Sequence, residues 1–100
     1  MIPQKTVEEL IIKHSTLEKD LSSGNIDKKI FAEKSKEYSD LNEIIDDAKK
    51  YASFEKDKTE LEKILDDQGS DTELLKMATT ELKDLQILHE KIEKRLKLFL

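Results

Sequence analysis

The longest uninterrupted pattern in the chain runs from Asp27 to about Asp67, some 40 residues without glycine or proline. Between Tyr38 and Ala48 its apolar residues follow one another at steps of 3, 4 and 3 positions, which keeps them on one stripe of a helix. At about 1.5 Å per residue, a single helix over 27–67 is a rod of about 60 Å. Such a rod cannot bury its stripe in a round core, so we expect it to pack lengthwise against other helices.

Two amphipathic segments, 6–22 and 71–100, flank this rod. In the first, Val7, Leu10, His14, Leu17 and Leu21 recur at steps of 3, 4, 3 and 4. In the second, the same alternation runs through Leu75, Ala78, Leu82, Leu85, His89, Ile92, Leu96 and Phe99. Each segment is therefore predicted to be a helix with one apolar face.

The turns and caps between these helices are signalled by small and polar residues. Gly24 can take the left-handed conformation that ends a helix, and Gly69 is the predicted stop of the rod. Asp27 is the predicted N-cap of the rod. Capping-box spacing predicts two further N-caps, Thr6 paired with Glu9 and Ser70 paired with Glu73.

Short turns make sequence neighbours antiparallel, so the predicted fold class is all-α. We expect an antiparallel three-helix bundle that extends into a long two-helix coiled-coil hairpin, all within a single domain, 1–100. Adjacent apolar residues at 30–32 and at 44–45 widen the stripe, which predicts two partner helices there. The far half, from about 51 to 82, should be a bare hairpin with an acidic turn. The apolar end at Leu98, Phe99 and Leu100 predicts an N-terminal piece of a longer protein.

Composition narrows the class of protein. The chain is 41% charged and 36% hydrophobic, which suits a thin helical bundle better than a thick globular core. There is no cysteine, no apolar run long enough to span a membrane and no signal-peptide pattern, so a soluble cytoplasmic protein is expected. The net charge of −5, with acids and lysines interspersed, argues against a surface that grips nucleic acid broadly.

Residues that could carry chemistry are few. His14 and His89 fall on the apolar stripes and could approach each other in the three-helix base, but a metal site would need a third ligand. The neighbouring acids Asp46 and Asp47 diverge on a helix, which disfavours an acid–base pair. We therefore expect no catalytic, cofactor-binding or metal-binding residues, no small-molecule substrate, and a protein that is not an enzyme.

Several segments, taken together in order and spacing, resemble the N-terminal domain of bacterial class I peptide chain release factors. They are Leu10-Ile11 through Leu17-Glu18-Lys19-Asp20-Leu21, the run from Phe31 to Ile45 with Ser35-Lys36-Glu37-Tyr38 and Leu41, Asp71-Thr72-Glu73-Leu74, Met77-Ala78 and Glu81. Within that family, the segment with Tyr38 resembles the members that read the stop codons UAA and UAG.

This resemblance implies a role in translation termination, with the ribosome as the partner. In the family the first domain is a helical arm that reaches toward the stalk base, its protein and nearby rRNA, and influences the GTPase release factor. The family's codon-reading Pro-x-Thr and hydrolytic Gly-Gly-Gln motifs are absent from this chain. Two alternatives stay open: a tRNA-gripping hairpin like that of seryl-tRNA synthetases, and a coiled-coil adaptor without a role in translation.

The predicted contact surface is the tip of the hairpin. Four acids, Asp66, Asp67, Asp71 and Glu73, lie within eight positions with no lysine or arginine between them. Such a cluster attracts basic surfaces at short range. The alternative is that these acids only keep the turn soluble and cap the last helix.

Overall fold

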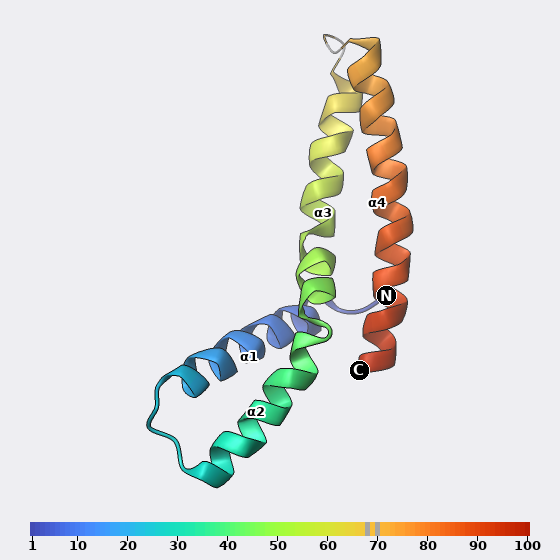
Figure 1. Ribbon diagram of the computed structural model, residues 1–100. Coiled ribbons are helices and arrows are strands. Elements are labelled where there is room, and N and C mark those ends of the chain that lie inside the picture. The colour runs from blue at the N-terminus through green and yellow to red at the C-terminus, as the bar shows by residue number, and fades with distance from the viewer. Residues whose placement is uncertain (68, 70) are drawn as a thin grey trace.

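The computed structural model describes residues 1–67, 69 and 71–100, and within them every regular element is an α-helix. The four helices are α1 (Gln4–Ser22), α2 (Lys28–Asn42), α3 (Ile45–Asp66) and α4 (Thr72–Phe99). They form two antiparallel hairpins, α1–α2 and α3–α4, which diverge from a common junction (Figure 1). The molecule measures 60 × 26 × 20 Å, so it is an elongated arm. The all-α prediction is confirmed.

The predicted continuous helix over 27–67 is wrong, because the chain breaks between α2 and α3 at Glu43 and Ile44. There the amides of Glu43 and Ile44 bond to the carbonyls of Asp40 and Leu41, three residues back, and Ile44 has φ −118° and ψ −5°. The regular pattern restarts when the Ala48 amide donates to the Ile44 carbonyl. No glycine or proline lies at this break, so we attribute it to packing. The break directs the Ile44 side chain into the core that the helices share.

Steps of three residues along the start of α3 explain how one helix serves two partners. Ile45, Ala48, Tyr51 and Phe54 are all buried, and each step of three moves the side chain about 60° round the helix. Ala48 and Tyr51 consequently lie in one cluster with Val7 of α1 and with Ile92 and Leu96 of α4, and Tyr51 and Phe54 also stack on His89 of α4. The apolar face of α3 thus turns round the helix and contacts both neighbours.

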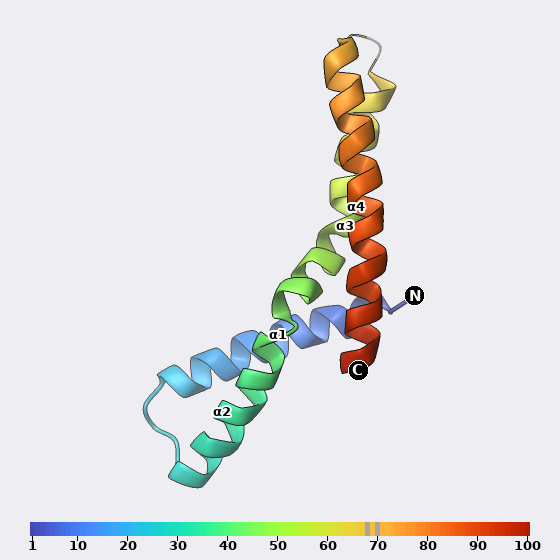
Figure 2. The ribbon, with the colours of Figure 1, turned by 45° about the vertical axis from the view of Figure 1, so that its right-hand side comes forward.

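The main core lies at the start of α3, which packs against α1 and against the end of α4. Its buried members are Ile2, Val7, Ile44, Ala48, Tyr51, Ile92 and Leu96. The predicted three-helix base therefore exists, but it is displaced toward the start of α3. Ile30 and Phe31, expected there, are 44% and 47% exposed, because α2 runs away from α4 beside α1 (Figures 1 and 2). The second wide arc is confirmed, since Ile44 and Ile45 are both buried.

Residues 1–3, which we call the strap, begin beside the last turns of α4 and lead into α1. The Ile2 side chain is buried, its amide donates to the Tyr51 hydroxyl at 3.1 Å, and its carbonyl accepts from that hydroxyl at 3.2 Å. The side-chain amide of Gln4 donates to the Ala52 carbonyl at 3.1 Å. These bonds attach the beginning of the chain to α3 and so fix one hairpin against the other.

Ion pairs link neighbouring helices along the surface. Arg95 of α4 makes two hydrogen bonds to the carboxylate of Asp47 in α3, at 2.7 and 2.9 Å. Lys34 of α2 pairs with Asp20 of α1 at 2.7 Å. Pairs this exposed contribute little to stability, because water and salt screen the two charges.

The predicted caps meet different outcomes. Gly24 has φ 75° in the turn after α1, as predicted, and Asp27 precedes α2 as its N-cap residue without a side-chain hydrogen bond. The prediction for Thr6 is wrong, because α1 begins at Gln4 after Pro3, whose fixed φ suits a helix start. Ser70 lies outside the described residues, and the cap of α4 is Asp71.

No helix in the described part of the chain is both long enough and apolar enough to cross a membrane.

Candidate partner-contact surface

The tip of the α3–α4 hairpin carries the four predicted acids. Asp66 ends α3, Asp67 follows it, Asp71 precedes α4, and Glu73 stands in the first turn of α4. All four side chains are exposed. The fold therefore brings the four carboxylates to the same end of the arm, away from the α1–α2 hairpin (Figure 1).

Two of these acids also shape the turn. The Asp67 carboxylate accepts from the Gly69 amide at 2.9 Å, and the Asp71 carboxylate accepts from the Leu74 amide at 2.7 Å. The second bond satisfies one of the free amides at the start of α4 and is a helix N-cap. Glu73 lies where the helix dipole favours a negative charge. Local structure thus accounts for part of the cluster.

The tip retains negative charge that no cation of the described residues pairs with. Within the described residues, none of the four carboxylates forms an ion pair with a lysine, arginine or histidine. A compact group of exposed anions at the end of an arm produces a field that reaches about one Debye length, roughly 8–10 Å. Chemically, the tip can attract a basic surface.

Two exposed apolar side chains beside these acids escaped the sequence reasoning. Leu74 is 41% exposed and Met77 is 60% exposed, both in the first turns of α4. They fall off the stripe of Leu75 and Ala78 that faces α3, and this offset was the available signal. Together with the acids they give the tip the mixed apolar and charged character of a contact surface.

The two histidines occupy separate aromatic environments instead of a shared site. His14 stacks on Tyr38 of α2, with ring centroids 4.8 Å apart, and its Nε2 donates to the Asn42 side-chain oxygen at 2.5 Å. His89 stacks on Tyr51 and Phe54, with centroids 4.7 and 3.7 Å away. Its Nδ1 is buried and has no hydrogen-bond partner among the residues that the structure describes. In the part of the chain that the structure covers, no three His, Cys, Asp or Glu side chains could hold a metal ion together.

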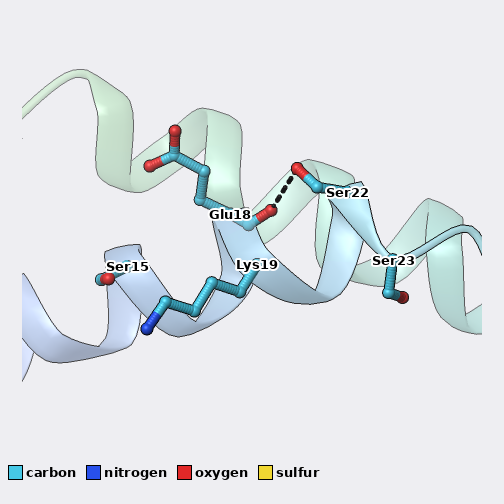
Figure 3. A pocket seen from close by; sticks show the side chains of 5 residues that line it. All are labelled: Ser15, Glu18, Lys19, Ser22 and Ser23. Atoms are coloured by element: carbon cyan, nitrogen blue, oxygen red, sulfur yellow. Dashed lines mark hydrogen bonds between the residues drawn. The ribbon is translucent and has the colours of Figure 1, made fainter.

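A shallow hollow on α1 offers no convergent chemistry. It is lined by exposed residues of the same helical surface, Ser15, Glu18, Lys19, Ser22 and Ser23 (Figure 3). The Ser22 hydroxyl donates to the Glu18 carbonyl at 2.8 Å, and the Ser23 hydroxyl donates to the Asp20 carbonyl at 2.7 Å. Because these hydroxyls bond to their own helix, the hollow has the character of solvated surface.

The fold and the tip together define a helical arm suited to contact with a macromolecular partner. Comparison with known proteins gives its family: residues 10–100 match the PCRF domain, and the chain belongs to that family. Among curated proteins it is similar to Peptide chain release factor 1 of Pelagibacter ubique (strain HTCC1062), at 68% identity over 100 residues. The match covers 100% of this chain and 28% of that relative, so the chain spans little more than a quarter of the relative's length. No solved structure matches significantly.

Proposed function

We propose that this chain is the N-terminal interaction arm of a class I peptide chain release factor of the UAA- and UAG-reading type. It acts in translation termination in the cytoplasm by contact, without catalysis of its own. The tip acids dock on basic protein at the stalk base of the large ribosomal subunit, beside rRNA. This contact also affects the action of the GTPase release factor. The family membership and the name of the relative support this role over a tRNA-gripping hairpin.

One observation supports the docking site above all others. Within the described residues, the far half of the α3–α4 hairpin has no third helix against it, and its end carries acids without an ion-pair partner beside exposed Leu74 and Met77. Stability does not require so long a projection, because the main core lies at the other end. A projection of this kind is best explained as a device that reaches a partner.

In this proposal the two ends of the arm have different roles, one as a base and the other as the contact surface. The junction of α1, α3 and α4, with the strap bound to Tyr51, supplies a rigid base. The hairpin then holds the tip at a fixed distance from that base. In a longer factor, codon reading and hydrolysis belong to the remaining chain, and the arm selects where on the ribosome the factor is held.

The test is sedimentation of this chain with large ribosomal subunits at varied salt. Replacing Asp66, Asp67 and Asp71 with Asn removes three charges and keeps the turn and cap, because the Asn side-chain oxygen accepts the same bonds. We expect about tenfold weaker binding at low salt and a smaller difference at high salt. A matched control removes three exposed acids from the other hairpin, through Glu8→Gln, Glu9→Gln and Glu33→Gln.

One outcome would contradict the proposed docking of the tip acids. If the tip variant and the control bind equally, the acids serve only the turn and its solubility. In the full-length factor that carries this chain, the same tip variant should also slow recycling by the GTPase factor. Unchanged peptide release and unchanged recycling would separate the tip from termination.

A further inference from the structure

The outer face of α4 carries a row of lysines that the sequence does not reveal at first sight. Seven exposed residues follow one another at steps of 4, 3, 4, 4, 3 and 4 positions: Lys76, Thr80, Lys83, Ile87, Lys91, Lys94 and Leu98. These steps keep them on one stripe, opposite the stripe that packs on α3. From the first lysine to the last, the row extends about 27 Å along the helix. From Lys76 to Leu98 it contains no acid, and Glu73 of the tip continues the same stripe three positions before Lys76.

Nothing in the described structure covers or neutralises this row. Among the helices, α4 packs against α3, and its other side faces solvent (Figures 1 and 2). None of the four lysines forms an ion pair with any described carboxylate, whereas Arg95 and Lys97, off the row, both do. The charges of α4 are therefore sorted, in contrast to the mixing that the sequence suggested.

The exposed lysines of α3 are not sorted in this way. Lys49, Lys56 and Lys63 are also exposed and form a stripe on α3. Glu60 and Asp67 fall on that same stripe, so its field is largely cancelled. On α4, Asp84 and Glu90 lie about 60° to either side and border the row. The result is a narrow line of positive charge.

We propose that this row binds the phosphate backbone of RNA. A line of regularly spaced cations fits a strand of phosphates, and lysine contacts phosphates without regard to sequence. A protein partner fits less well, because lysine is depleted at protein interfaces and Ile87 is the one large apolar member of the row between Lys76 and Lys94. The proposal rests on the proposed function for its setting, since RNA is what surrounds an arm on a ribosome.

The row also complements the acidic tip. The tip repels phosphates and the shaft attracts them, so an arm with its tip on basic protein would lie with α4 along adjacent RNA. This arrangement explains how a chain of net charge −5 can contact a surface rich in RNA. It also predicts that the two contacts can be removed independently.

The experiment measures binding of this chain to a fluorescent RNA stem-loop with a stem of about 16 base pairs, across a range of salt. Four phosphate contacts predict that log K falls against log salt with a slope of about −3.6. The row variant Lys76→Gln, Lys83→Gln and Lys91→Gln should weaken binding at least tenfold and reduce the slope to about −1. Glutamine keeps the helix, because its helix propensity is close to that of lysine, and circular dichroism verifies this.

The matched control is the α3 variant Lys49→Gln, Lys56→Gln and Lys63→Gln, which changes the net charge equally and should keep the slope. Equal losses in both variants would overturn the proposal by showing an effect of net charge. So would the absence of RNA binding at low salt, or equally tight binding of poly-glutamate. Because the tip acids are intact throughout, this outcome is distinguishable from a failure of the docking test.

Discussion

Tyr51→Phe is the sharpest test of how the two hairpins are joined. The change removes one hydroxyl, which accepts from the Ile2 amide and donates to the Ile2 carbonyl, and leaves the ring stacked on His89. Both Tyr51 and Ile2 are buried, at 6% and 5% exposure, so the two backbone groups would lose their partner away from water. Removing this one oxygen atom therefore tests whether the Tyr51 hydroxyl holds the strap in place.

The magnitude follows from two routes open to the variant. If the strap stays in place, two unsatisfied buried groups destabilise the fold by about 1–3 kcal/mol each. If the strap peels into water, the loss is the burial of the Ile2 side chain, about 1.5–3 kcal/mol. The chain takes the less unfavourable route, so we expect a loss of about 2 kcal/mol. For a domain of this size, that lowers the melting temperature by roughly 10 °C.

Urea unfolding followed by circular dichroism measures the loss, and amide exchange at Ile2 reports the strap directly. The control is Tyr38→Phe, because the Tyr38 ring also stacks on a histidine but its hydroxyl makes no hydrogen bond in the described structure. The control should change stability by less than about 0.5 kcal/mol. Equal effects of the two substitutions would refute the assignment of the strap to the Tyr51 hydroxyl.

Three further predictions concern the junction, the cap and an ion pair. Leu41→Ala should cost about 2–5 kcal/mol in urea melts, because Leu41 is buried, and Leu61→Ala should cost less, because Leu61 is half-buried in the bare hairpin. Asp71→Ala should lose about 1 kcal/mol, and Asn at this position should restore it, if the side-chain bond to α4 is a true N-cap. The hydrogen bond from Lys97 and then the N-terminal ammonium hold the pKa of Glu93 below its ordinary value of 4.5. This contribution is present above pH 4.5 and is lost as the pH falls through the lowered pKa, so Glu93→Gln should flatten the acid limb of stability.

Periodicity predicted much of the fold because burial on a helix follows fixed steps. The stripes of Val7, His14 and Leu17, and of Ala78, Ile92 and Leu96, are buried as those steps require. The turn at Gly24 was equally readable, since its positive φ suits glycine. These features depend on residues close together in the sequence.

The break at Glu43 and Ile44 depends on distant residues and was not readable. No residue there disfavours a helix strongly, and the kink places Ile44 in one buried cluster with Ile2, Val7 and Leu96 of α4. Asp46 and Asp47, at the start of α3, were the one local hint, since acids favour helix N-termini. Once the break redirected α2, the expected packing around Ile30 could not form.

The contact surfaces divide in the same way. The acids of the tip were predicted because they stand together in the sequence. The lysine row was missed, because its members are three and four positions apart and acids lie between them. The row becomes visible only when the structure shows which face of α4 packs on α3 and which face is exposed.

The most direct test of the tip as a ribosome contact is site-specific crosslinking. A photoreactive residue at Thr72, exposed at the tip, should crosslink this chain to a basic protein of the large ribosomal subunit. The same residue at Thr16, exposed on α1, should give little or no crosslink to that protein. Crosslinks from Thr16 alone, or none from Thr72 with ribosomes bound, would contradict the proposed docking of the arm.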